Sequence, residues 1–142
     1  VREVEWALRF AGAALAGDAD DLLPRRHDPI PTITYDGKVV LLSPELAGFT
    51  SDRYGDFTAG SVRDTPLDEI VERAATHPTG WLAEYLAGVE ACRASCAYFG
   101  FCGGAHAANR YFEQGRFDTT RTRHCLNSRI ALLEGVLDHA RG

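Results

Sequence analysis

The sequence predicts an α+β fold in which a small β-hairpin is followed by helices and a cysteine-rich loop region. Residues 32–42, TITYDGKVVLL, place an Asp-Gly pair between two β-forming runs, which is a strong local signal for a hairpin. Much of the remaining chain spaces its apolar side chains at the intervals of a helix. All four cysteines lie at or after Cys92. Together these observations predict a small domain with its hairpin first and its helices and cysteine-rich region after it.

The composition fits one compact domain. A chain of 142 residues with 45% apolar side chains can close one hydrophobic core but is too short for two ordinary domains. Its net charge of -5 disfavours a nucleic-acid partner, because phosphate binding depends on cationic side chains. No apolar run approaches the roughly 20 residues that span a bilayer, and the acidic start does not fit a secretory signal. We therefore expect a cytoplasmic, soluble protein with no nucleic-acid or membrane partner.

The first 30 residues predict a helix and a connector. Apolar side chains recur at helical spacing over residues 1–16, and Gly17 followed by Asp18 supplies a stop. Residues 18–30, DADDLLPRRHDPI, mix acids, prolines and bases and predict an irregular segment. The chain has no Met and begins at Val1, so we expect it to be a piece of something longer or to have lost its initiator.

The hairpin is predicted to turn at Asp36-Gly37, as a two-residue loop between residues 32–35 and 38–42. Residues 43–64 are rich in Gly, Ser and Asp without sustained periodicity. They predict loops, with a short strand near residues 56–58.

Four helices are predicted after the loops. Thr65 can cap the first, Pro66 suits its first helical position, and the helix is expected to reach about Ala75 before His77-Pro78 ends it. A second helix leads to Cys92 and is marked by Trp81, Leu82, Tyr85, Leu86 and Val89. Two more are expected over residues 105–114 and 125–140.

The cysteines carry the strongest chemical signal. Cys92, Cys96, Cys102 and Cys125 form the pattern C-x3-C-x5-C-x22-C. In the reducing cytosol such clustered thiols are more often metal ligands than disulfides. Structural zinc usually takes tight Cys-x2-Cys pairs, whereas an iron-sulfur core accepts looser spacings and a remote fourth ligand. The spacing favours a four-iron cluster and leaves open zinc, disulfides and unligated buried thiols; a single catalytic thiol is disfavoured.

The residues around the cysteines add to this interpretation. Gly103 and Gly104 allow positive φ angles after Cys102 and could bring amide donors to sulfur. Two further groups are candidates: the aromatic side chains Tyr98, Phe99 and Phe101, to exclude water, and the basic side chains Arg121, Arg123 and His124, to offset thiolate charge. Ordinary core packing and a solvated basic loop explain these two groups equally well.

The stretch CRASCAYFGFCGGAHAANRYFEQGRFDTTRTRHC resembles the SPASM domain, the C-terminal extension of radical S-adenosylmethionine (radical SAM) enzymes that modify peptides. The hairpin ITYDGKVVLLSPELAG and the following YGDFTAGSVRDTPLDEI resemble the segment before the cluster in the branch that makes cyclophane crosslinks. The resemblance covers about Ile33 to Leu137. It implies that residues 31–142 form a SPASM/twitch-like domain. Residues 1–30 would then link it to a radical SAM barrel that this sequence lacks.

The resemblance also implies the ligands. Cys92, Cys96, Cys102 and Cys125 match those of the family's second auxiliary cluster, whereas His106 stands where a cysteine of the first cluster would be. No cysteine precedes Cys92. We therefore expect one 4Fe-4S cluster held by four thiolates, with His106 as a helix residue facing substrate or solvent.

The implied function is an auxiliary-cluster domain that relays electrons and supports the peptide site. The enzyme would install C-C crosslinks in a ribosomally synthesised precursor peptide, using S-adenosylmethionine and a second 4Fe-4S cluster in the barrel domain or subunit. The barrel's C-x3-C-x2-C motif is absent from this sequence, so no catalytic residue is assigned here and activity of the chain alone is not expected. The alternative is a zinc-stabilised module that binds a peptide or protein without catalysis.

Overall fold

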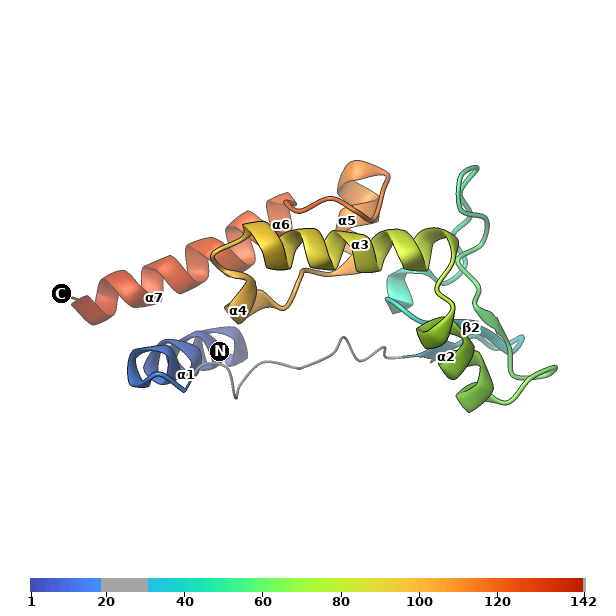
Figure 1. Cartoon of the computed structure of the whole chain (residues 1–142), viewed down its shortest axis with the longest axis horizontal. Coiled ribbons are helices and arrows are strands. Elements are labelled where there is room, and N and C mark those ends of the chain that lie inside the picture. The colour runs from blue at the N-terminus through green and yellow to red at the C-terminus, as the bar shows by residue number, and fades with distance from the viewer. Residues whose placement is uncertain (19–30, 142) are drawn as a thin grey trace.

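A computed structural model describes residues 1–18 and 31–141 and is mostly helical, with one small antiparallel sheet near the N-terminus (Figure 1). The elements in chain order are α1 (Arg2–Ala16), β1 (Thr32–Ile33), β2 (Lys38–Val40), η2 (Pro44–Leu46), β3 (Gly60–Ser61), α2 (Leu67–Thr76), α3 (Gly80–Ser95), α4 (Phe99–Cys102), α5 (Ala107–Gln114), α6 (Arg123–Cys125), η3 (Leu126–Ile130) and α7 (Ala131–Arg141). This is the α+β class that the sequence predicts. Within the described residues, no helix is both long enough and apolar enough to cross a membrane.

The first helix is confirmed, and it packs against the last. Gly17 ends α1 in the left-handed conformation with φ 84°, which glycine adopts without steric cost. Figure 1 shows α1 beside α4 and α7, and α1 contacts α7. Their shared core consists of Ala7, Phe10, Ala11, Phe101, Leu133 and Val136. Most of the predicted connector, residues 19–30, lies outside the described residues.

The hairpin is confirmed, but its turn is one residue longer than predicted. Thr32 pairs with Val40 and Ile33 with Val39 in an antiparallel register. The Gly37 N–H donates to the Thr34 carbonyl, and the Thr34 N–H donates to the Lys38 carbonyl. Three residues therefore form the loop, with Gly37 at φ 87°, because a left-handed glycine after a turn lets a three-residue loop close. The two-residue turn was wrong.

A third strand extends the hairpin and lies later than the strand predicted near residues 56–58. β3 pairs with β2, Lys38 opposite Ser61 and Val39 opposite Gly60. Residues 56–58 turn instead: the Thr58 N–H donates to the Asp56 carboxylate at 3.1 Å, and the buried Phe57 has φ 55°. This side-chain bond to the backbone competes with strand pairing.

The helices α2 and α3 cover the sheet and contribute to its core. α2 begins one residue later than predicted, because Pro66 with ψ 146° occupies the capping position. It ends at His77, as expected. Ile70 of α2 packs with Val39 and Leu41. The larger core cluster joins the sheet to α3 and α5 and comprises Val40, Leu42, Leu46, Phe57, Tyr85, Val89, Ala107 and Phe117.

The cysteine region is helical, whereas the sequence predicts loops there. α3 continues past Cys92 to Ser95, and a short helix, α4, follows and ends at Cys102. Residues 123–141 are helical throughout, as α6, the π turn η3 and α7. Phe101 is buried between α1 and α7, and this tertiary packing stabilises a segment too short to form a helix alone.

Candidate metal centre

Each cysteine lies at a helix end near the C-terminal half of α3. Cys92 is in the last turn of α3, Cys96 follows that helix as its C-cap, Cys102 ends α4, and Cys125 ends α6. Cys92 and Cys125 are buried, the other two are half-buried, and all four are free thiols. The Thr122 side chain caps α6 by accepting the Cys125 N–H at 3.0 Å. Segments that are distant in the sequence are thereby brought near one another.

The four thiols are close enough to interact electrostatically. Burial is the main cause that raises the pKa of Cys125, and the neighbouring thiols of Cys102, Cys96 and Cys92 raise it further. Burial likewise raises the pKa of Cys92, with additional increases from Cys102 and Cys96. The buried thiols are therefore protonated at neutral pH unless a cation stabilises the thiolate.

The cysteines do not close around one point. Among residues 1–18 and 31–141, no group of three or more His, Cys, Asp or Glu side chains is arranged to hold a metal ion. A tetrahedral zinc site needs four sulfurs about 2.3 Å from one ion. The described residues contain no preformed site of that kind. Four Cys thiolates are the donor set of a 4Fe-4S cluster, but the described residues do not hold the four sulfurs together as a cluster-forming group.

A buried arginine contacts this group of thiols. Arg110 of α5 is 0% exposed, and its guanidinium donates to the carbonyls of Phe117 at 2.7 Å, Tyr85 at 3.4 Å and Gly104. Nη2 also lies 3.4 Å from the Cys92 sulfur. The guanidinium carbon lies 5.2 Å from the centre of the Tyr85 ring, a cation-π distance.

Gly88 makes room for Arg110, and Gly104 packs closely against Val89. A Cβ atom at Gly88 of α3 would meet the Arg110 Nη1 atom, and it would lie 2.6 Å from the Phe117 carbonyl oxygen and 2.7 Å from Asp118 Cα. Gly104 has φ 109°, and a Cβ atom there would lie 3.0 Å from Val89. The guanidinium therefore crosses α3 at a position where a side chain would not fit.

No carboxylate of the described residues neutralises Arg110. In the described part of the chain none lies within ion-pair distance of its guanidinium, and its Nε atom has no hydrogen-bond partner. Burying an unpaired charge is costly. The Cys92 sulfur is the acceptor at this site that can carry a negative charge, and the positive charge of Arg110 lowers the pKa of Cys92 against the dominant effect of burial.

A hollow of about 220 Å³ opens beside the thiols. It is lined by Tyr85, Cys102, Gly103, Ala105, His106, His124, Cys125 and Arg129. The Tyr85 hydroxyl donates to the Ala105 carbonyl at 3.1 Å, and burial raises its pKa to about 12. His106 is exposed and caps the start of α5, so the imidazole lies at the edge of the hollow rather than among the four sulfurs.

The residues predicted around the cysteines have mixed outcomes. Gly103 and Gly104 have positive φ angles, as expected, but the Gly103 N–H donates to the Phe99 carbonyl. The aromatic side chains pack into the core, with Phe101 buried and Tyr98 and Phe99 half-buried against it.

The sequence did not indicate Arg110 as the cationic side chain beside a cysteine sulfur. Arg121 and Arg123 are exposed and His124 lines the hollow, whereas Arg110 contacts Cys92. A signal was present, because Arg110 follows Ala107 by three residues and so shares the buried face of α5.

Comparison with known proteins supplies one relative without an assigned role. An uncharacterized protein of Synechocystis sp., sll1766, is 33% identical to this chain over 96 residues, which are 68% of this chain and 24% of the relative. The chain thus spans about a quarter of that relative's length. No family model matches the chain. No solved structure matches it either.

Proposed function

We propose that this chain is a SPASM-like domain that binds one auxiliary 4Fe-4S cluster within a radical SAM enzyme acting on a precursor peptide. The ligands would be the thiolates of Cys92, Cys96, Cys102 and Cys125. The proposal rests on the sequence resemblance and on the structure around Arg110.

The buried charge of Arg110 carries the proposal furthest. A guanidinium that is 0% exposed and has no carboxylate partner in the described residues needs an anion nearby. Cys92 is 3.4 Å away, and metal binding deprotonates a cysteine outright. A metal-bound thiolate at Cys92 would neutralise Arg110, whereas a protonated thiol would leave it uncompensated.

The loose cysteine spacing favours a cluster over the alternative of a zinc-stabilised binding module. The thiols interact electrostatically, yet they do not gather around a single point. A four-iron core is larger than one zinc ion and sits between ligands that are further apart. The distant Cys125 is then an ordinary fourth ligand.

The residues around the cysteines indicate what the protein would contribute to such a cluster. An iron-sulfur cluster supplies one-electron transfer when bound. The four thiolates would leave no ligand position for substrate, because each donor of the set is used. Arg110 would donate to the Cys92 sulfur, and bonds to sulfur tune the reduction potential. Phe101, which directly precedes Cys102 in the sequence and is buried in the core, would limit water access to the cluster.

The remaining partners are proposed from the resemblance. They are the radical SAM barrel with its own 4Fe-4S cluster, S-adenosylmethionine, and the precursor peptide in which C-C crosslinks form. The Synechocystis relative is about four times as long as the segment it shares with this chain, so a homologous region does occur within a larger protein.

Replacing Cys102 or His106 by alanine tests the ligand assignment. After anaerobic reconstitution, C102A is expected to lose most of its iron and to melt at a lower temperature, because metal binding is coupled to folding. H106A is the matched control and should retain the iron content of the parent chain. Equal iron content in C102A and the parent would contradict the assignment. Iron loss in H106A with a retained fold would identify a second site.

A further inference from the structure

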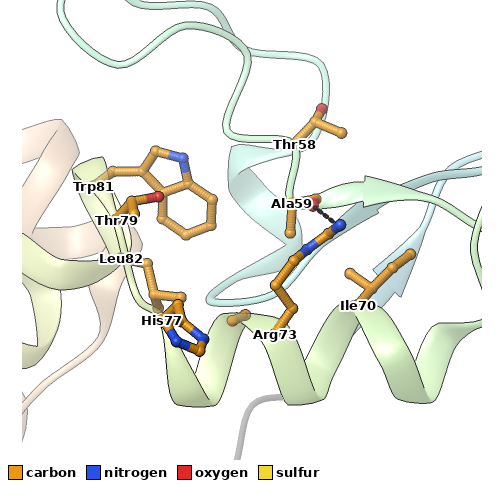
Figure 2. A pocket seen from close by; sticks show the side chains of 9 residues that line it. Thr58, Ala59, Ile70, Arg73, His77, Thr79, Trp81 and Leu82 are labelled. Carbon is orange, nitrogen blue, oxygen red and sulfur yellow. Dashed lines mark hydrogen bonds between the residues drawn. The ribbon is translucent and has the colours of Figure 1, made fainter.

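A second hollow lies at the other end of α3 from the cysteines. It has a volume of about 340 Å³ and is lined by Thr58, Ala59, Ile70, Arg73, Ala74, His77, Thr79, Trp81 and Leu82. Figure 2 shows these side chains arising from α2, the start of α3 and the segment before β3. The 16 residues of α3 span about 24 Å, so this hollow is separate from the thiols.

The polar groups of this hollow are basic or neutral. Arg73 and His77 lie one helical turn apart, and none of the lining residues is acidic. The Arg73 Nη2 atom donates to the Ala59 carbonyl at 3.4 Å (Figure 2). Glu69 lies one turn before Arg73, yet no described carboxylate forms an ion pair with the guanidinium. Arg73 therefore retains donors and a full charge.

Gly60 lies against Ile70 and Arg73 of α2. A Cβ atom at Gly60 would lie 3.1 Å from Ile70 and 3.4 Å from the Arg73 guanidinium. The first distance is tight and the second is an ordinary van der Waals contact, so the guanidinium lies directly beside the strand. Because the Ala59 bond orients one edge of the planar fork, less rotamer entropy is lost when an anion binds.

An aromatic wall stands opposite Arg73 (Figure 2). Trp81 is half-buried and is held from behind by Phe57, with ring centres 6.1 Å apart, and by Phe117, with ring centres 6.4 Å apart. In Figure 2 the indole and Leu82 lie on the side of the hollow away from Ile70. The Trp81 ring packs against the core, and its exposed part can contact an apolar group.

We propose that this hollow binds a carboxylate joined to an apolar group, as found at the C-terminus or at an acidic residue of a peptide. The guanidinium of Arg73 matches a carboxylate in two parallel hydrogen bonds. The apolar part would contact Trp81 and Leu82 in place of water. This inference goes beyond the proposed cluster and does not require metal at the cysteines.

The test uses N-acetyl-leucine as the probe and N-acetyl-leucinamide as its uncharged counterpart. The chain has two Trp residues, so the indole N–H of Trp81 reports binding by NMR and that of Trp6 serves as an internal reference. We expect a saturable shift of the Trp81 signal with the acid, none with the amide, and no shift of Trp6.

R73Q should weaken binding roughly tenfold or more. R63Q removes an exposed arginine outside the hollow and should bind within twofold of the parent.

Equal shifts with acid and amide, or equal binding by R73Q and the parent, would overturn the proposal. A third probe, the α-amide of N-acetyl-leucyl-glutamic acid, carries its one carboxylate on a side chain. Tighter binding of this probe assigns the site to an acidic residue, and tighter binding of N-acetyl-leucine assigns it to a C-terminus. Iron uptake is measured separately: a chain that takes up no iron on reconstitution contradicts the cluster, and its binding of the acid would still support the carboxylate site.

Discussion

Replacing Gly88 with alanine is expected to lower the free energy of unfolding by about 3 kcal/mol. In an unobstructed helix the same change raises stability by up to about 1 kcal/mol. Here the new methyl group would meet Arg110 and two backbone atoms, the Phe117 carbonyl oxygen at 2.6 Å and Asp118 Cα at 2.7 Å. The backbone of residues 117–118 cannot move without breaking the Arg110 bond to Phe117.

Chemical denaturation of G88A beside G135A measures this effect. Gly135 lies in α7, and a Cβ atom there would meet nothing within 4 Å, so G135A should be neutral or stabilising. The two substitutions have the same chemistry and opposite expected signs. Similar stability changes in both variants would show that α3 and the 117–118 segment are not packed as described.

Removing the buried charge of Arg110 is expected to be comparably severe. R110M leaves the carbonyls of Phe117, Tyr85 and Gly104 without their donor. Leaving a buried acceptor without its donor costs about 1 to 3 kcal/mol, and R110M leaves three, although it also removes the cost of burying the charge. R110K keeps the charge but lacks the planar fork, so an intermediate loss is expected. R121M removes an exposed arginine and should change stability by no more than about 0.5 kcal/mol.

The same variants separate a packing role from a role toward the thiols. Iron retention after reconstitution should fall in the order parent, R110K, R110M, because the guanidinium lies 3.4 Å from the Cys92 sulfur. R121M should retain iron like the parent chain. Full iron retention by a folded R110M would contradict the charge pairing and leave Arg110 a structural role alone.

Local signals predicted the fold where a single residue decides the conformation. Gly17 ended α1 and the Asp-Gly pair located the hairpin. The turn length and the strand position depended on competing hydrogen bonds to the backbone, which the sequence pattern does not reveal. Gly37 could end a two-residue or a three-residue loop. The hydrogen bond from the Gly37 N–H to the Thr34 carbonyl closes a three-residue loop. The strand predicted at residues 56–58 failed because Asp56 binds the Thr58 N–H.

The four cysteine ligands stay a prediction from the sequence, and their surroundings were not predictable. The cysteine spacing nominates four thiols as donors, but it does not show that each cysteine lies at a helix end. Arg110 contacts Cys92 from 18 positions away, and its role depends on the space that Gly88 leaves on another helix. Such a contact arises from tertiary packing. A single sequence therefore indicates that a buried arginine needs an anion, but it does not identify the residue that supplies the anion.

The metal content of the anaerobically reconstituted parent chain tests the central claim most directly. The account predicts a brown protein with about four irons and about four acid-labile sulfides per chain and a broad absorption band near ~400 nm. A colourless chain that binds about one zinc ion would support the binding-module alternative. A chain that binds no metal and retains four titratable thiols would contradict both.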